Sequence, residues 1–94
     1  MPDSHTTPVI TVRLVYLARL REAFGQAGET LSLPKEGCSV AKVVARLRER
    51  GGPFAAELAA GRAVRVAVNH AMARQDAAVS DGDEVALLPP VTGG

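Results

Sequence analysis

The sequence predicts an α+β domain in which a mixed sheet packs on one main helix. Three observations support this class. Short segments rich in β-branched residues lie near both ends of the chain, a strongly amphipathic helix lies between them, and hydrophobic residues make up 47% of the composition. The 94 residues are near the lower limit for a domain that folds alone. With no Trp, one Tyr and two Phe, the core should be aliphatic. Because Cys38 is the single cysteine, we expect no internal disulfide, which fits a reducing compartment.

A hairpin is predicted at the beginning of the domain. Residues 10–17 alternate as a half-buried strand does, and residues 29–34 form the expected partner strand, which ends at Pro34. Between them, residues 18–25 favour a short helical turn that stops at Gly25. The face of the first strand that we expect to enter the core holds Ile10, Val12, Leu14 and Tyr16.

The main helix is predicted over residues 38–53. Ser39 is a natural N-cap, because its hydroxyl can accept a hydrogen bond from a free amide of the first turn. Gly51 and Gly52 are expected to end the helix. Its apolar stripe, with spacing i, i+3, i+4, i+7, holds Val40, Val43, Val44 and Leu47. This stripe should cover one face of the sheet.

The second half of the chain supplies the remaining strands. We expect a short helix over 53–61, a strand over 63–69, a turn and short strand over 69–75, and a last strand over 84–88. Val85 and Leu87 face inward in the last strand. This order predicts a ubiquitin-like β-grasp roll with the first and last strands parallel neighbours. The domain then spans residues 9–88, between a disordered arm at 1–8 and an extended tail at 89–94.

The charge balance argues against nucleic-acid binding. Lys and Arg number 11 and Asp and Glu number 10, whereas nucleic-acid binders carry a clear basic excess. No apolar run approaches the ~20 residues that span a bilayer, and the N-terminus lacks a signal-peptide pattern. We therefore expect a soluble, cytoplasmic protein with no membrane partner. No metal-ligand spacing is present, and His5, Cys38 and His70 are interpreted as ordinary polar, loop or turn residues.

The C-terminal tail carries the predicted chemistry. It consists of Pro89, Pro90, Val91, Thr92, Gly93 and Gly94. The prolines favour an extended course, the β-branched residues stiffen it, and the glycines suit a narrow cleft. Because nothing in the tail can pack, we expect it to be mobile until bound. Attack of the Gly94 carboxylate on the α-phosphate of ATP would give a mixed anhydride that a sulfur nucleophile can open. A frayed terminus is the alternative interpretation.

Three stretches carry a resemblance to a known family. They are "VYLARLREAFG" (15–25), "AVN" (67–69) and above all "SDGDEVALLPPVTGG" (80–94). The chain resembles the sulfur-carrying small subunits of molybdopterin synthases, a branch of the ubiquitin-like sulfur carriers. The similarity covers residues 9–94. The sequence departs from the family pattern at Leu87 and Leu88, where aromatic residues are frequent, and in its longer N-terminal arm.

The resemblance implies a function and a set of partners. An E1-like adenylating enzyme would use ATP to adenylate Gly94, and a sulfur-transfer protein would convert the adenylate to a thiocarboxylate. The tail would then enter the active site of the large synthase subunit, in a heterotetramer. There the sulfur would pass to cyclic pyranopterin monophosphate to build the molybdopterin dithiolene. The chain itself would be non-catalytic and bind no cofactor, with the catalytic lysines and arginines on the large subunit.

A partner surface is predicted from the alternation of the strands. If Leu14 and Leu87 lie in the core, their sequence neighbours point outward. The outward aliphatic residues near the root of the tail are Val15, Leu17 and Leu88, with Met72 from a neighbouring strand. Such a patch indicates a protein interface, and scattered surface aliphatics are the alternative. Asp83 and Glu84 are interpreted as solvated strand-entry residues, with contact to a basic partner as a second interpretation.

Two other functions stay open at this point. The chain could be a protein modifier that is conjugated to lysines through Gly94, as ubiquitin is. It could also carry sulfur for another pathway, such as thiamine synthesis, cysteine synthesis or tRNA thiolation. Related carriers for thiamine or cysteine usually lack the double proline of "PPVTGG".

Overall fold

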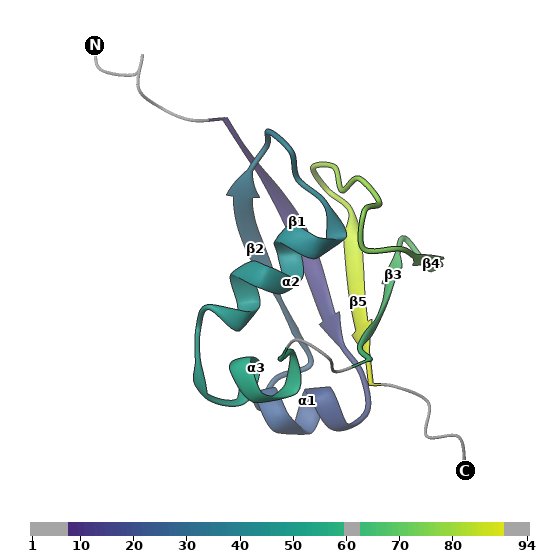
Figure 1. Cartoon of the computed structure of the whole chain (residues 1–94). Helices are drawn as coiled ribbons and strands as arrows, with labels where there is room; N and C mark the ends of the chain where they lie inside the picture. The colour runs from purple at the N-terminus through teal and green to yellow at the C-terminus, as the bar shows by residue number, and fades with distance from the viewer. Residues whose placement is uncertain (1–7, 60–62, 90–94) are drawn as a thin grey trace.

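The computed structural model describes residues 8–59 and 63–89 (Figure 1). Its elements are β1 (Val9–Tyr16), α1 (Arg19–Phe24), β2 (Gly28–Pro34), α2 (Val40–Arg48), α3 (Gly52–Glu57), β3 (Arg65–Val68), β4 (Ala71–Ala73) and β5 (Glu84–Leu88). The predicted elements are therefore present in the predicted order. The α+β class and the ubiquitin-like β-grasp roll are confirmed.

The five strands form one mixed sheet in the order β2-β1-β5-β3-β4. β1 and β5 pair in parallel at its centre, as predicted, and the other pairs are antiparallel. Figure 1 shows α2 crossing one face of the sheet, with α1 and α3 gathered near the end where β1 and β5 finish. The last strand thus lies between two neighbours and ends where the tail begins.

The core lies between the sheet and α2. The inward face of β1 is buried as predicted, since Ile10, Val12, Leu14 and Tyr16 are each at most 4% exposed. The predicted stripe of α2 is buried too, at Val40, Val43, Val44 and Leu47. Val85 and Leu87 of β5 complete this layer with no exposed surface. The apolar face of the sheet packs against the apolar stripe of α2, and this contact forms the hydrophobic core of the domain.

The ends of α2 follow from local chemistry. The Ser39 hydroxyl accepts a hydrogen bond from the Lys42 amide at 3.3 Å, which confirms the predicted N-cap. The helix ends at Arg48, before the predicted limit, and α3 begins at Gly52. Gly51 has a positive φ of 76°, in a region that non-glycine residues avoid. The left-handed backbone there separates the two helices.

An aromatic cluster holds α1 and α3 against the end of β1. Tyr16 meets Phe24 edge to face with ring centroids 4.8 Å apart, and Phe24 stacks on Phe54 of α3 at 4.2 Å. The Tyr16 hydroxyl donates to Glu29 at 2.6 Å, and Arg50 donates to the same carboxylate oxygen at 2.7 Å. Burial raises the pKa of Tyr16 well above its ordinary value, so the hydroxyl stays a donor. The cluster fixes the end of the domain from which the tail leaves.

Candidate functional site

The face of the sheet away from α2 carries an apolar row across four strands. Val15 of β1 lies opposite Ala86 of β5, Ala86 lies opposite Ala67 of β3, and Ala67 lies opposite Met72 of β4. These side chains point away from the core because their strand neighbours, such as Leu14 and Leu87, enter it. We call this face the outer face and the four residues the outer row.

Two of the predicted interface residues, Val15 and Met72, belong to the outer row at the middle of β5, and the other two, Leu17 and Leu88, lie at the end of β5 where the tail begins. Met72 is 54% exposed and Leu17 39% exposed, while Val15 and Leu88 are half-buried. The Leu17 amide donates to the Leu87 carbonyl at 3.2 Å, which fixes Leu17 beside the end of β5. The structure thus gathers the four residues into one surface, and their contact with a partner stays a prediction.

Sequence reasoning missed the middle of this surface. Ala67 and Ala86 join Val15 to Met72, and Ala86 is only 9% exposed although it lies outside the core cluster. Alanine gives no hydrophobic signal strong enough to mark an interface. The alternation in β5, which places Ala86 on the same face as Leu88, was the signal that could have found it.

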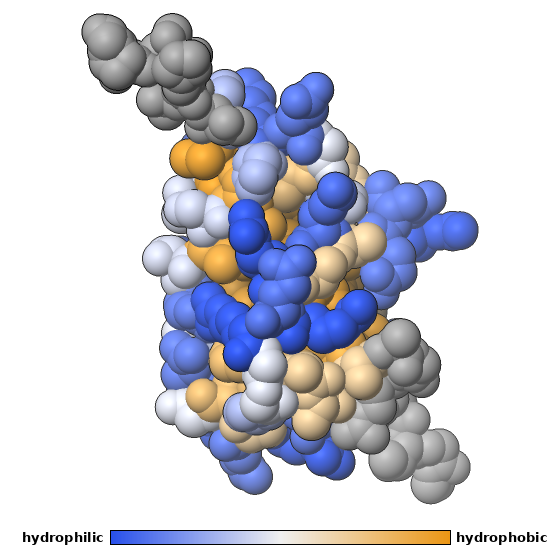
Figure 2. Space-filling view, turned by 60° about the vertical axis from the view of Figure 1, so that its left-hand side comes forward, coloured by the Kyte–Doolittle hydropathy of each residue, from blue (hydrophilic) through white to orange (hydrophobic). Residues whose placement is uncertain are grey.

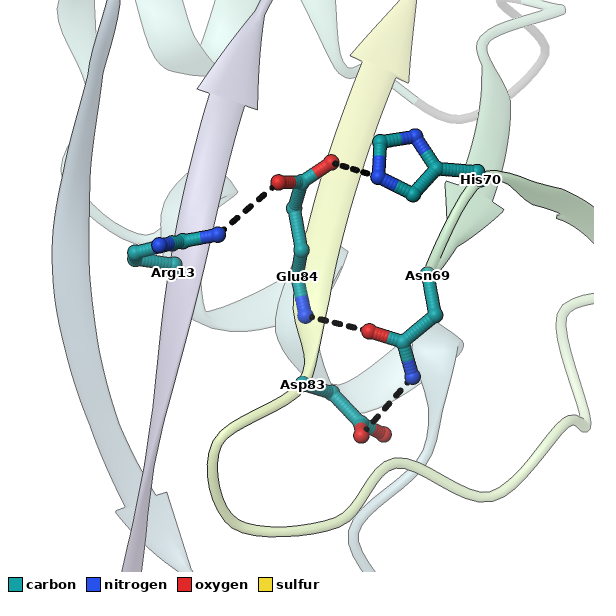
Figure 3. A network of polar contacts seen from close by, with 5 residues as sticks. All are labelled: Arg13, Asn69, His70, Asp83 and Glu84. Carbon is teal, nitrogen blue, oxygen red and sulfur yellow. Dashed lines mark hydrogen bonds and ion pairs between the residues drawn. The ribbon is translucent and has the colours of Figure 1, made fainter.

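The other end of the outer face is polar (Figure 3). Glu84 accepts a hydrogen bond from Arg13 at 2.9 Å through one carboxylate oxygen, and the other lies 3.6 Å from Nε2 of His70. Asn69 accepts from the Glu84 amide at 3.0 Å and donates to Asp83 at 3.0 Å. The carboxylate of Glu84 is thus engaged on both sides, which argues against the interpretation that it meets a basic partner.

A two-residue turn places His70 in this network. Asn69 and His70 join β3 to β4 with positive φ angles of 51° and 73°. Two successive left-handed residues are the mark of a tight hairpin turn, and Asn is one of the residues that tolerates this backbone best. The interpretation of His70 as a turn residue fits this geometry.

The tail leaves the domain from the centre of the sheet. Leu88 is the last residue of β5, and Pro89, which follows it, is half-buried. The other predicted tail residues lie outside the part that the structure describes: Pro90, Val91, Thr92, Gly93 and Gly94. Their proposed roles therefore stay predictions from sequence.

The structure also bears on the other residues that the sequence analysis considered. Cys38 is buried, and burial raises the pKa of its thiol despite the nearby Lys42, which disfavours a thiolate nucleophile. No group of three or more His, Cys, Asp or Glu residues in ranges 8–59 and 63–89 could hold a metal ion. His5 lies outside those ranges. Within them, no helix is both long and apolar enough to cross a membrane.

The helix side of the molecule differs from the outer face. Figure 2, in which the left-hand side of Figure 1 comes forward, shows a band of hydrophilic residues across the middle with apolar residues above and below it. The arginines of α2, Arg46 and Arg48, are exposed, as expected for a solvated helix face.

Fold and site together define a class: a ubiquitin-like β-grasp domain whose central last strand leads into a C-terminal tail beside an apolar face. The chain belongs to the ThiS family of sulfur carriers, whose model matches residues 14–94. A curated relative, the molybdopterin synthase sulfur carrier subunit of Haemophilus influenzae, is 31% identical over 83 residues, 88% of this chain and 99% of the relative. The resemblance drawn from the sequence is confirmed.

Solved structures share the fold. The Haloferax volcanii HVO 2177 protein has a TM-score of 0.81 at 26% identity, over 98% of this chain and 93% of that one. A putative molybdopterin converting factor, subunit 1, from Pyrococcus furiosus has a TM-score of 0.72 at 27% identity, over 87% and 99%. SAMP1 from Haloferax volcanii has a TM-score of 0.71 at 23% identity, over 89% and 99%, a likeness of fold alone.

Proposed function

We propose that this protein is the sulfur-carrier subunit of a molybdopterin synthase. The observation that carries the proposal is the similarity to the Haemophilus influenzae carrier, which extends over 99% of that relative. The geometry supports it, since β5 brings Pro89 to the edge of a surface that contains Leu17 and Leu88. The reactive tail and a docking surface thus share one end of the domain.

The proposed chemistry takes place at the carboxylate of Gly94. A carboxylate oxygen attacks the α-phosphorus of ATP in an E1-like enzyme, pyrophosphate leaves, and an acyl adenylate forms. A persulfide of a sulfur-transfer protein then displaces AMP, and a thiol reduces the resulting acyl disulfide to the thiocarboxylate. The carrier supplies no general acid or base, and the only nucleotide in the scheme belongs to the activating enzyme.

The charged carrier then delivers its sulfur to the large subunit. Val15, Leu17, Met72 and Leu88 dock on that subunit while the tail from Pro89 to Gly94 enters its active site. Glycines at the tip and prolines at the root give a slim, extended lead suited to a narrow channel. Two such deliveries build the dithiolene from cyclic pyranopterin monophosphate, within a heterotetramer in the cytoplasm. The catalytic lysines and arginines lie on the large subunit.

Intact mass tests the proposal. After incubation with ATP, the activating enzyme and a sulfur donor, exchange of oxygen for sulfur at Gly94 adds ~16 Da, the result of opening an activated acyl group with sulfur. The charged carrier should then convert cyclic pyranopterin monophosphate to molybdopterin when the large subunit is added. A chain without Gly94 is the control and should show neither result while melting as the full chain does. Synthase activity that survives this deletion would refute the role of the tail.

A second function is protein modification. It is favoured by the likeness to SAMP1, a small archaeal modifier protein, although that likeness is one of fold alone. In that case Gly94 would be joined to lysine side chains through an isopeptide bond. High-mass adducts in the same incubation, with no increase of ~16 Da on the free chain, would favour this function. Sulfur transfer to another pathway would instead give the mass increase without molybdopterin formation.

A further inference from the structure

An arginine that has no ion-pair partner among the described residues lies beside the end of β5, where the tail begins. Arg65 of β3 sits directly opposite Leu88 in the antiparallel pair with β5. It points to the outer face, because its neighbour Val66 is buried in the core at 2% exposure. Its side chain is exposed and makes no hydrogen bond or ion pair within ranges 8–59 and 63–89.

Other arginines in the described part of the chain are mostly engaged. Five of them form side-chain bonds: Arg13 with Glu84, Arg19 with Glu57, Arg48 with the Leu58 carbonyl, Arg50 with Glu29, and Arg74 with Asp76. Arg21 and Arg46 also lack a bond in these ranges, but Arg21 belongs to α1, at the end of the sheet, and Arg46 to α2, on the opposite face (Figure 1). Among the described arginines, Arg65 is therefore the one on the outer face whose side chain forms no hydrogen bond or ion pair in these ranges.

The two ends of the sheet differ in charge. Asp81, Asp83 and Glu84 lie at the start of β5, far from the tail. At the end of β5, Arg65 is joined by Arg74, which follows Ala73, the register partner of Val66. Arg74 is 91% exposed and lies only loosely against Asp76, at 3.8 Å. The margin of the apolar surface beside the tail is thus cationic.

We propose that Arg65 is a specificity-determining contact that binds an acidic side chain of the large synthase subunit at the mouth of the cleft that receives the tail. The inference rests on the proposed function. Neighbouring strands lie about 4.8 Å apart, so a protein that covers Leu88 also meets Arg65. An exposed guanidinium at the margin of an apolar interface steers and orients a partner of opposite charge.

Association kinetics with the purified large subunit test this contact. Arg65→Glu should lower the association rate constant about tenfold at low ionic strength, because a charge at the rim acts mainly on the encounter step. Arg65→Gln should have a smaller effect in the same direction. In 1 M salt, where the Debye length falls to about 3 Å, the difference from wild type should nearly vanish.

Arg46→Glu is the matched control. It makes the same change of charge at an exposed arginine of α2, on the opposite side of the sheet, that has no side-chain bond to any described residue. It should leave the rate within about twofold of wild type. An equal effect of Arg65→Glu and Arg46→Glu would show a general charge effect and overturn the inference. An unchanged or faster association of Arg65→Glu would overturn it too.

Two further readouts separate the inference from the proposed function. Both variants should melt as wild type does, since neither arginine makes a side-chain bond in the described part of the chain. If wild type binds the large subunit and the Arg65 variants associate with it at the same rate as wild type, the inference fails and the proposed function stands. If wild type does not bind the large subunit at all, both fall.

Discussion

Arg13 and Glu84 lie directly opposite each other on the parallel strands β1 and β5, and their side chains meet at 2.9 Å on the outer face. The pair therefore joins the first strand of the domain to the strand that carries the tail. The pair lies at the centre of the sheet, but it is exposed to solvent, since the Arg13 side chain is 67% exposed. Solvent screening limits what such a pair contributes to stability.

A double-mutant cycle measures this contribution. Arg13→Ala and Glu84→Gln should show a coupling free energy of about 0.2–1 kcal/mol in urea unfolding, the range of exposed ion pairs. Glu84→Gln keeps the backbone bond to Asn69, so the turn stays in place. A coupling well above this range would mean that the pair is shielded from water.

Acid should weaken the contact between Glu29 and Arg50. The hydrogen bond from Arg50 is the main cause that lowers the pKa of Glu29 below its ordinary 4.5, against a smaller opposing effect of burial. A carboxylate whose pKa is lower in the folded state stabilises the protein above its unfolded pKa, and this stabilisation is lost as pH falls through the folded pKa. Urea midpoints of wild type should therefore decline below pH 4.5.

Glu29→Gln is the comparison for this pH effect. The variant lacks the titrating group, so its urea midpoint should be lower at neutral pH and should decline less steeply in acid. Parallel curves for the two proteins would show that other carboxylates cause the acid sensitivity.

Two glycines should respond differently to alanine. A Cβ on Gly28 would overlap the backbone carbonyl oxygen of Leu14 in the neighbouring strand, whereas a Cβ on Gly25 would meet open space. Gly28→Ala should cost roughly 1–3 kcal/mol of unfolding free energy through overpacking. Gly25→Ala should cost about 1 kcal/mol because its φ of 73° strains alanine. Guanidinium unfolding of both variants compares the two losses of unfolding free energy. A larger loss for Gly25→Ala than for Gly28→Ala would contradict the geometry.

The apolar part of the outer face should be required for docking. Leu17→Asp places a charge beside the end of β5, where the proposed partner excludes water, and should weaken binding to the large subunit at least about tenfold. Val9→Asp is the control, because Val9 is 58% exposed at the start of β1, whereas Leu17 directly follows the last residue of that strand. Binding is measured by calorimetry after both variants are shown to be folded. Equal losses in the two variants would rule out a localised interface.

The fold was largely predictable because its signals are local and repeated. The alternation in residues 10–17 defines the apolar face of a strand, and the stripe from Val40 to Leu47 defines the apolar face of a helix. A sheet and a helix that each have one apolar face can pack in few ways. The end of α2 was placed too late, because the amides of Arg50 and Gly51 bond to carbonyls three residues back, at Leu47 and Arg48, and so form a tighter turn after the α-helix ends.

The site was predictable only in part, because its remaining members depend on register. The position of Arg65 beside Leu88 follows from the pairing of β3 with β5, which no periodicity in the sequence specifies. The bond between Tyr16 and Glu29 likewise joins residues of different strands whose polar atoms meet only after the hairpin forms. The predicted roles of Pro90 to Gly94 rest on sequence and resemblance, since these residues lie outside the described ranges.

The central place of β5 also has a mechanical consequence. A protein that pulls on Pro89 draws β5 along its own axis, against hydrogen bonds to β1 on one side and β3 on the other. Such a pull strains many bonds in shear at once, whereas a strand at the edge of a sheet can be peeled away bond by bond. Under the proposed function, in which the tail enters a channel of the large subunit, this arrangement lets the tail be withdrawn repeatedly without unfolding the domain.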